Sequence, residues 1–427
     1  MTNWEQKLEK FRDKMLPFVE ILEGQRHMTA IRKAMVTLMS FTVLGSFTLV
    51  AVNIAAWFPT TAYSLYINAN IDLVMLLFNY TIGYLGIYTT LFIAFFLADH
   101  YKLNNIGCAA TAVMFFCVNS TVIKDGVSSI PYADAKGMFA GILIAIFVVE
   151  INEWFRKKRW MVKMPEGVPN FVAKSFELLV PLLVCGLLAF VVRALALALF
   201  GKLIPEMILS ILSPLVVSLD TVWGIVLINT IAQLLWWFGI HGDGCLRSVV
   251  LAPMMAFLAE NMSAYAHGQP VSHLFTNGVW SAFYMVTGSG ITLGLIIPML
   301  FSKSERYRAV GKIALIPSFF SVNEPIIFGA PVVYNAILFF PFVIGNAILS
   351  FLITMVFYAG LVPLPFMEPP GFTPFPMQGF LCNLSWTSVV FQLCIIAAST
   401  LMYWPFFKMV EKQELEIEAG LRSAHED

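Results

Sequence analysis

The sequence predicts an all-α polytopic membrane protein with about ten transmembrane helices and with re-entrant hairpins in its second half. Hydrophobic residues make up 59% of the 427 positions, only 12% are charged, and the mean hydropathy is +0.79. Ordinary soluble domains hold about 25% charged residues. Because a span needs about 20 apolar residues, the length accommodates roughly ten spans with short connections. The long apolar runs are 34–57, 71–98, 104–122, 137–155, 175–199, 220–238, 247–262, 277–301, 342–362 and 387–407.

Residues 1–33 precede the first apolar run and predict an amphipathic cytoplasmic helix, because apolar residues recur at helical spacing. This helix either lies on the inner leaflet of the membrane or packs as a soluble helix under the bundle. The recurring residues are Trp4, Leu8, Phe11, Met15, Phe18 and Leu22.

Most of the 26 Lys and Arg residues lie between alternate apolar runs or near the two ends of the chain. Basic residues accumulate in cytoplasmic loops. We therefore expect a multi-pass membrane protein with both termini in the cytoplasm, including the tail 408–427.

A boundary near residue 160 predicts two membrane halves, 34–160 and 175–407. A basic cluster at Arg156–Arg159 is followed by Pro165, Gly167 and Pro169, which stop a helix, and 161–174 then predict an amphipathic linker. The first half carries few charges within its apolar runs, so we expect the chemistry in the second half.

Two apolar segments of the second half are too rich in proline to be simple spans. Residues 313–341 predict a re-entrant hairpin, and 363–386 predict an outer loop that either dips into the mouth of the pathway or forms a rigid cap. Irregular backbone at membrane depth is tolerated only where protein or a water-filled cavity satisfies its polar groups. Gly239, Gly242 and Gly244 likewise predict a broken helix around His241.

The candidate site is centred on Glu324, which follows Asn323 at one of these breaks and for which we expect His241 as the nearby partner. Intramembrane ionisable groups usually mark substrate, ion or proton sites. An amide, a carboxylate and an imidazole together donate and accept hydrogen bonds, which suits a neutral, hydroxyl-rich solute.

Other residues near this site have structural as well as functional interpretations. Trp237, Phe372 and Trp386 are candidate apolar walls for a sugar ring, although membrane-protein tryptophans often anchor at interfaces. Gly242 and Asp243 follow His241 and are further candidates for substrate contact, although Asp243 is also spaced to pair with Arg247 along a helix.

The six cysteines suggest packing rather than chemistry, and no metal-type cluster or phosphate-binding glycine loop is visible. We expect no metal, no cofactor and no nucleic-acid partner. The expected partners are a sugar substrate and the lipid bilayer.

Three motifs in order resemble a known family. They are Met164-Pro165-Glu166-Gly167-Val168-Pro169, Ile240-His241-Gly242, and Asn323-Glu324-Pro325 with Phe328-Gly329. The chain resembles the membrane permease subunit of the bacterial phosphoenolpyruvate-dependent sugar phosphotransferase system, of the lactose, cellobiose and diacetylchitobiose type.

This resemblance implies a homodimer of ten-span subunits, in which the first half forms the dimer contact and the second half transports a disaccharide. Glu324 and His241 match the family's sugar-contacting acid and histidine. The resemblance also implies that a separate cytosolic subunit phosphorylates the imported sugar from a phosphocysteine, so that this chain carries no phosphorylated residue itself. Glu324 would then orient the reacting hydroxyl or accept its proton.

Two questions stay open at the level of sequence. Family members often carry tryptophan beside the Thr-Pro of the outer loop, whereas this chain has Phe372, so the identity of the sugar is undetermined. A proton-coupled secondary sugar transporter, with Glu324 and His241 as a relay, is the main alternative. A membrane-embedded enzyme or sensor that binds sugar without moving it is the second.

Overall fold

The computed structural model describes residues 25–160, 162, 176–330, 332–371 and 373–426. The amphipathic helix expected in 1–33 falls largely outside these residues, as do most of the linker 161–174 and Phe372. The described chain divides into two compact units. Unit 1 comprises the described residues of Ser218–Arg247 and Pro270–Asp427, and unit 2 those of Asp13–Val217 and Ser248–Gln269.

Unit 2 is built of helices and one short β-hairpin. Its helices are α2 (Arg26–Trp57), α3 (Ala62–Ala69), α4 (Ile71–Thr81), α5 (Leu85–His100), α6 (Asn105–Ser120), α7 (Met138–Lys158), α9 (Leu179–Phe200), α10 (Ile204–Leu219) and most of α12 (Gly242–Ala266). Short 3₁₀ turns, η1 (Ile82–Tyr84) and η2 (Ala135–Gly137), precede α5 and α7. Strands β1 (Val122–Lys124) and β2 (Val127–Ser129) pair antiparallel, with Lys124 opposite Val127.

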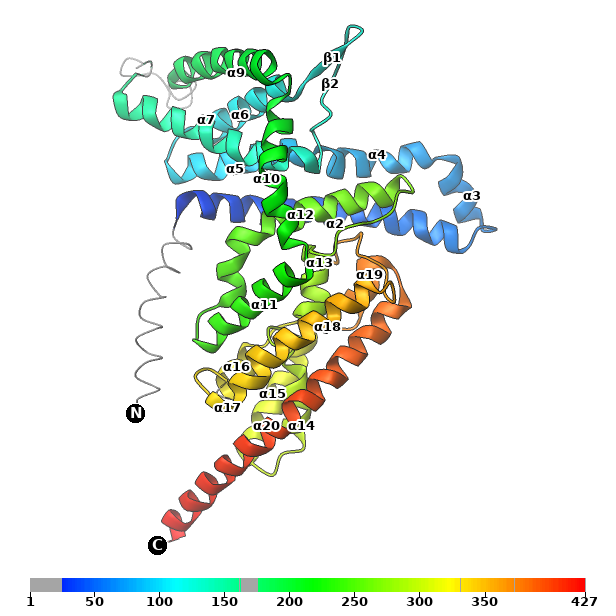
Figure 1. The fold of residues 1–427 in the computed structure, drawn as a ribbon, viewed down its shortest axis with the longest axis vertical. Helices are drawn as coiled ribbons and strands as arrows, with labels where there is room; N and C mark the ends of the chain where they lie inside the picture. The colour runs from blue at the N-terminus through cyan, green and yellow to red at the C-terminus, as the bar shows by residue number, and fades with distance from the viewer. Residues whose placement is uncertain (1–24, 161, 163–175, 331, 372, 427) are drawn as a thin grey trace. The chain divides into compact units, whose positions relative to one another are not determined.

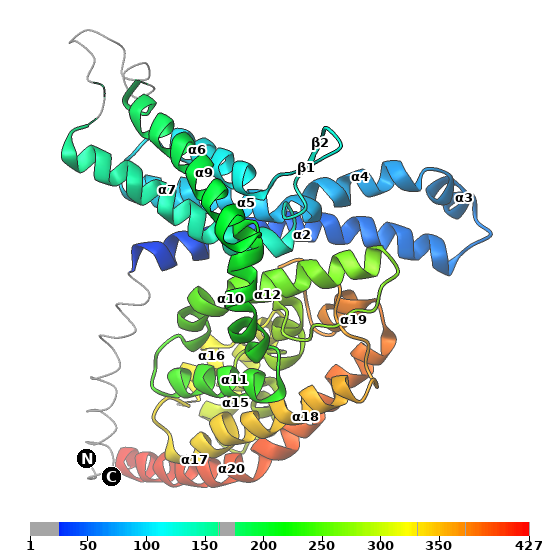
Figure 2. The ribbon, with the colours of Figure 1, turned by 45° about the horizontal axis from the view of Figure 1, so that its top comes forward.

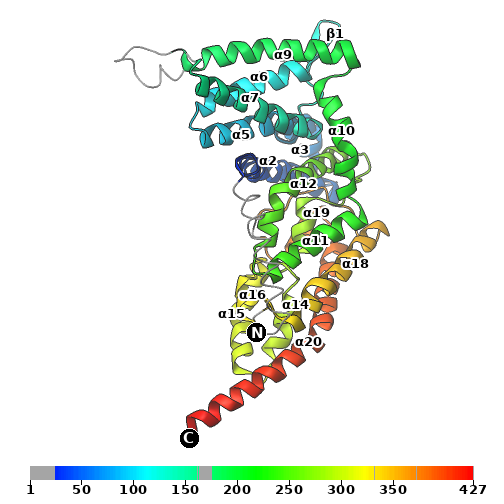
Figure 3. The ribbon, with the colours of Figure 1, turned by 60° about the vertical axis from the view of Figure 1, so that its left-hand side comes forward.

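Small residues allow the helices of unit 2 to pack closely. Helix α5 packs against α2, α6 and α7, and α6 packs against α9, so that these helices form stacked layers (Figure 3). A Cβ atom added at Gly141 of α7 would lie 2.9 Å from the Gly86 carbonyl oxygen of α5. Such close approach is the usual basis of helix association in membranes.

Arg193 lies within α9, and the sequence leaves its role open. Its Nη1 atom donates a hydrogen bond to the Val118 carbonyl oxygen, 2.8 Å away near the end of α6. The guanidinium therefore satisfies a helix-end carbonyl group, which has no partner within its own helix.

Unit 1 contains the broken segments that the sequence predicts. Its elements are α11 (Val222–Trp237), the first turn of α12, α13 (Asn277–Val279), the π-helical turn η3 (Trp280–Tyr284), α14 (Leu293–Leu300), α15 (Glu305–Phe319), α16 (Glu324–Gly329), α17 (Ala336–Phe339), the π-helical turn η4 (Phe340–Gly345), α18 (Asn346–Tyr358), α19 (Met377–Asn383) and α20 (Trp386–Glu426). Helix α18 runs between α11 and α20 (Figures 1 and 2).

A buried polar cluster joins α11 to α18 inside unit 1. The Asn229 side-chain amide donates to Asn346 Oδ1 at 2.9 Å and also to Ser350 Oγ, and Gln233 Nε2 donates to Asn229 Oδ1 at 3.1 Å. All four side chains are fully buried. Because the apolar surroundings offer no competing water, this cluster fixes the register between the two helices.

The predicted fold class is confirmed, and the count of about ten spans stays a prediction. Within the described residues, seven helical stretches are long and apolar enough to cross a membrane, and α10 with α11 pass the same test as a bent pair. Helix α6 is apolar but shorter. The expected breaks are present, since 313–341 contains parts of α15 and η4 with two short helices between them, and no helix occupies the described residues of 359–376.

The described part of the tail 408–427 continues helix α20, whose end projects beyond α14 and α15 (Figure 1). Glu411 accepts hydrogen bonds from Ser302 Oγ at 2.7 Å and from the Lys303 backbone N–H at 2.8 Å. Arg306 pairs with Glu414 at 3.0 Å. These contacts attach the start of the tail to the loop between α14 and α15 and to the first turn of α15.

Candidate functional site

His241 lies in a tight turn between α11 and α12, and its ring orientation is fixed by the backbone. The Gly244 N–H donates to His241 Nδ1 at 2.9 Å. In the neutral ring the proton therefore resides on Nε2, which leaves that nitrogen as a hydrogen-bond donor on an exposed side chain. The ring also packs on Trp236, with ring centroids 4.4 Å apart.

The glycines around His241 serve this turn. A Cβ atom at Gly244 would lie 2.8 Å from His241 Nδ1, and one at Gly242 would lie 2.1 Å from the Ala232 carbonyl oxygen. Gly239 adopts φ +77°, a conformation that L side chains rarely adopt. The glycines thus let the chain turn sharply and let the backbone approach both α11 and the imidazole.

Glu324 is exposed and begins the six-residue helix α16, while the preceding Asn323 is 3% exposed. Asn323 Nδ2 donates to the Ser289 carbonyl oxygen at 2.6 Å. A Cβ atom at Gly288 would lie 2.5 Å from Asn323 Cβ. Asn323 therefore anchors the Glu324 backbone to another segment, and the carboxylate itself remains accessible.

The segment that holds Asn323 is an unusual loop, 287–291. Thr287, Gly288, Gly290 and Ile291 all have positive φ, with values of 62°, 102°, 79° and 53°. Tyr403 of α20 holds the loop by donating to the Gly290 carbonyl oxygen at 2.8 Å. Backbone in such sparsely populated regions is retained where the surroundings over-determine it, and it clusters at functional sites.

The proline-rich outer loop contacts the same region just before Glu324. The Phe375 N–H donates to the Phe319 carbonyl oxygen at 2.7 Å. Gln378 Nε2 donates to the Thr373 carbonyl oxygen at 2.6 Å and to Ser321 Oγ at 3.3 Å. Two segments that the sequence singles out separately are therefore in contact.

The His241 turn also contacts the chain that follows α16. The Tyr334 N–H donates to the Trp237 carbonyl oxygen at 3.0 Å, and Tyr334 Oη donates to the Phe238 carbonyl oxygen at 2.9 Å. Trp237 Nε1 donates to the Asn335 carbonyl oxygen at 3.0 Å, and its ring is 2% exposed. In this structure Trp237 ties the two segments together.

Asp243 links the His241 turn to a polar cluster that the sequence does not single out. It pairs with Arg247 at 3.0 Å, as the helical spacing indicates, and it accepts a hydrogen bond from Trp280 Nε1 at 3.0 Å. Close to Arg247 lies the buried Glu368, whose carboxylate accepts a hydrogen bond from Asn277. Glu368 belongs to the proline-rich loop, and an acidic residue in such an apolar context was a signal available in the sequence.

Two predicted residues, Trp386 and Phe372, have no described contact with the segments that carry His241 and Glu324. Trp386 begins α20, is 71% exposed, packs on Phe380 with centroids 4.9 Å apart and borders an open apolar hollow. Phe372 lies outside the described residues, although its neighbours Gly371 and Thr373 are placed. No hydrogen bond or ion pair joins Glu324 to His241 in the part of the chain that the structure describes.

The comparison with known proteins decides the family. A family model described as "Phosphotransferase system, EIIC" matches residues 32–345. The chain belongs to this family. It is therefore a sugar-transport permease of the phosphotransferase system, located in the bacterial plasma membrane.

Individual EIIC relatives match the chain over nearly its whole length. It is 27% identical to the "PTS system oligo-beta-mannoside-specific EIIC component" of Bacillus subtilis (strain 168), covering 95% of each chain. It is 28% identical to the "Lichenan permease IIC component" of the same organism, covering 96% of this chain and 94% of that one.

A longer relative and a solved structure extend the comparison. The chain is 27% identical to the "PTS system lactose-specific EIICB component" of Staphylococcus epidermidis, covering 99% of this chain and 74% of that protein. The crystal structure of the transporter ChbC, the IIC component of an N,N'-diacetylchitobiose-specific phosphotransferase system, matches with 26% identity and a TM-score of 0.85, covering 95% of this chain and 98% of that one.

Proposed function

We propose that this EIIC permease imports a β-linked disaccharide, such as cellobiose, lactose or diacetylchitobiose, and presents it to a cytosolic partner for phosphorylation. Relatives named for oligo-β-mannoside, lichenan and lactose, together with the diacetylchitobiose transporter, support a β-glycoside. The observation that carries the proposal is the convergence of three segments, which are the His241 turn, the 319–335 segment and the proline-rich loop.

The side chains on these segments divide into ligands and supports. Glu324, as an exposed acceptor, and His241, as an Nε2–H donor, bind sugar hydroxyls. Asn323 fixes the position of Glu324, and Gly242 and Asp243 hold the His241 turn. In this proposal Asn323, Gly242 and Asp243 also contact the bound sugar. Apolar contacts from Trp237, Phe372 and Trp386 to the sugar ring remain predictions.

Phosphorylation proceeds by transfer to a sugar hydroxyl from a phosphocysteine of the partner subunit. The hydroxyl oxygen forms a bond to phosphorus as the sulfur–phosphorus bond breaks, and the cysteine leaves as a thiolate. The hydroxyl proton passes either to the Glu324 carboxylate or to water. If water accepts the proton, Glu324 acts only to orient the hydroxyl group.

The same proposal assigns roles to the two membrane halves. Residues 175–407 move the sugar, 34–160 form the homodimer contact, and both termini face the cytoplasm. The placement of all described candidate residues in unit 1 supports the first of these assignments. The distribution of basic residues supports the orientation.

Sealed vesicles separate this function from proton-coupled transport. Vesicles containing the permease and its phosphorylated partner inside receive labelled cellobiose, lactose or diacetylchitobiose outside, with and without a proton gradient. We expect sugar phosphate inside the vesicles even after the gradient is collapsed. Accumulation of unmodified sugar that stops with the gradient would establish the relay instead, and binding without any internal label would indicate a sensor.

A further inference from the structure

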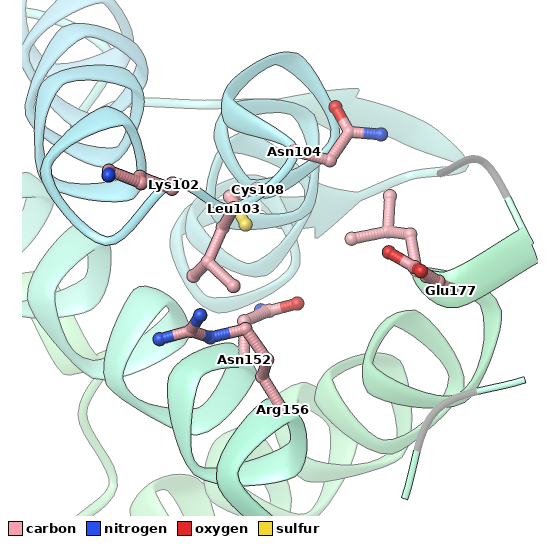
Figure 4. Close-up of a pocket in the computed structure, with 8 residues that line it drawn as sticks. Lys102, Leu103, Asn104, Cys108, Asn152, Arg156 and Glu177 are labelled. Carbon is pink, nitrogen blue, oxygen red and sulfur yellow. The ribbon is translucent and has the colours of Figure 1, made fainter. Parts of the chain in front are cut away.

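The small polar cavity of unit 2 is not a second site for the sugar. It lies where the turn after α5, the end of α7 and the residues just before α9 meet, and its volume is about 50 Å³ (Figure 4). Pockets for small ligands usually measure about 300–1,000 Å³. The charged side chains around the cavity, which include Lys102, Arg156 and Glu177, are exposed and specify no other ligand. Residues that shape sugar binding are therefore expected in unit 1.

Helix α11 ends just before His241, and its own chain caps only part of that end. The first N–H groups beyond the helix turn back onto the carbonyl oxygens of residues 234–236, at 2.9–3.1 Å. The carbonyl groups of Trp237 and Phe238 come next. Because carbonyl groups at the end of a helix have no partner within that helix, they take donors from another segment.

Tyr334 supplies a donor to each of these two carbonyl groups. Its backbone N–H donates to the Trp237 oxygen at 3.0 Å, and its Oη donates to the Phe238 oxygen at 2.9 Å. Its φ of 59° lies in the left-handed region, which a residue with a side chain keeps only where its surroundings hold it. Its ring also packs on Trp237 and Phe238, with centroids 5.8 and 6.2 Å apart. One residue therefore caps α11 from a distant part of the chain.

Tyr334 is also tied to the helix that begins with Glu324. The Val332 N–H donates to the Ile327 carbonyl oxygen near the end of α16, at 3.1 Å. Ile326, Ile327 and Val332 are all fully buried. Because these contacts fix Tyr334 relative to α16, a shift between Tyr334 and the end of α11 changes the separation between His241 and Glu324.

We propose that Tyr334 is a positioning residue for sugar binding, whose hydroxyl group holds the His241 turn at the separation from Glu324 that a bound disaccharide requires. This inference rests on the proposed function of His241 and Glu324. The hydroxyl group is used on the Phe238 carbonyl group, so Tyr334 acts on the sugar through His241. Without this bond the turn spends less time in the binding position, and the apparent affinity falls by the fraction of competent molecules.

The first measurement is equilibrium binding of a labelled β-linked disaccharide to the purified full-length protein. Tyr334→Phe removes the hydroxyl group and keeps both the backbone bond to Trp237 and the ring contacts. We expect its affinity to fall about fivefold, the factor that one neutral hydrogen bond supplies. Tyr358→Phe is the matched control, because Tyr358 Oη donates to the Asp220 carbonyl oxygen at 3.0 Å, at the opposite end of α11. Its affinity is expected to stay at the wild-type value.

A double variant separates positioning from direct contact with the sugar. If Tyr334 acts only through His241, Tyr334→Phe should weaken binding no further once His241→Ala is present. A hydroxyl group that contacts the sugar directly, or that only keeps the site compact, would cause the same fivefold loss in both backgrounds. That result would overturn the positioning role.

A measurement without sugar separates this inference from the proposed function. In protein carrying isotope-labelled histidine, we expect Tyr334→Phe to shift the magnetic resonance signals of the His241 ring. The signals of His267, an exposed histidine of unit 2, should not change. Unchanged His241 signals and full affinity in Tyr334→Phe would overturn the inference alone, provided that His241→Ala still weakens binding. Full affinity in both Tyr334→Phe and His241→Ala would overturn the proposed function and this inference with it.

Discussion

Replacing Gly288 by alanine tests whether the loop 287–291 positions Glu324. Gly288 has φ +102°, and a Cβ atom there would lie 2.5 Å from Asn323 Cβ. Backbone strain of this kind costs on the order of 1–3 kcal/mol, and the Asn323–Ser289 hydrogen bond that must move contributes about 1 kcal/mol. The loop is therefore expected to shift and to carry Asn323 and Glu324 with it.

The expected consequence is weaker sugar binding in a folded protein. If restoring the native loop costs about 2–3 kcal/mol, the apparent affinity for a disaccharide falls roughly 30–150-fold, since each 1.4 kcal/mol is a factor of ten. The assay is equilibrium binding of a labelled β-linked disaccharide to purified protein, with helical content measured in parallel. Gly201→Ala is the matched control, because Gly201 has φ +65° in unit 2 and nothing lies within 4 Å of the added Cβ.

Gly201→Ala introduces backbone strain without a steric clash, at a position far along the chain from Glu324. It is expected to lose some thermal stability and to keep the wild-type affinity. Full affinity in a folded Gly288→Ala protein would refute the idea that this loop sets the position of Glu324.

Two further predictions concern buried polar groups of unit 1. Burial raises the pKa of Glu368, which lies outside the candidate spans, to about 7, so the folded state holds a proton that the unfolded state releases above about pH 4.5. The free energy of unfolding should be greatest below about pH 4.5 and fall by roughly 3 kcal/mol as the pH rises through 7. This decline should vanish in Glu368→Gln. Melting temperatures measured across pH 4–8 that run parallel in the wild-type protein and the variant would contradict the prediction. Asn229→Ala removes the hydrogen bonds that Asn229 makes with three buried partners, Asn346, Ser350 and Gln233, and should cost about 2–4 kcal/mol in chemical unfolding. Thr230→Val, whose hydroxyl bonds only within its own helix, should cost less than about 1 kcal/mol. Equal losses would show that the cluster joining α11 to α18 is not stabilising.

The features that the sequence predicts correctly are those with local causes. Composition and apolar run length predict a helical membrane protein, and proline and glycine predict where helices break, because both effects act within one or two turns. The break before Glu324, the turn around His241 and the irregular proline-rich loop follow from such local signals.

Features set by packing between distant segments could not be predicted in this way. Asn277 and Glu368 are 91 residues apart, and only the tertiary structure places one beside the other. Asn323 is predicted as a ligand, yet its amide is used on the Ser289 carbonyl group, which no sequence pattern indicates. Trp237 illustrates the same limit, since its indole bonds to a carbonyl group 98 residues away.

The central claim is that His241 and Glu324 hold an uncharged sugar, and it is tested most directly by the affinity of His241→Ala. His267→Ala is the matched control, because His267 is an exposed histidine of unit 2 whose Nδ1 faces the Ser263 carbonyl oxygen at 2.7 Å. Loss of one hydrogen-bond donor should weaken disaccharide binding by roughly tenfold in His241→Ala, with no change in His267→Ala. Equal affinities for the wild-type protein and both variants would contradict the account.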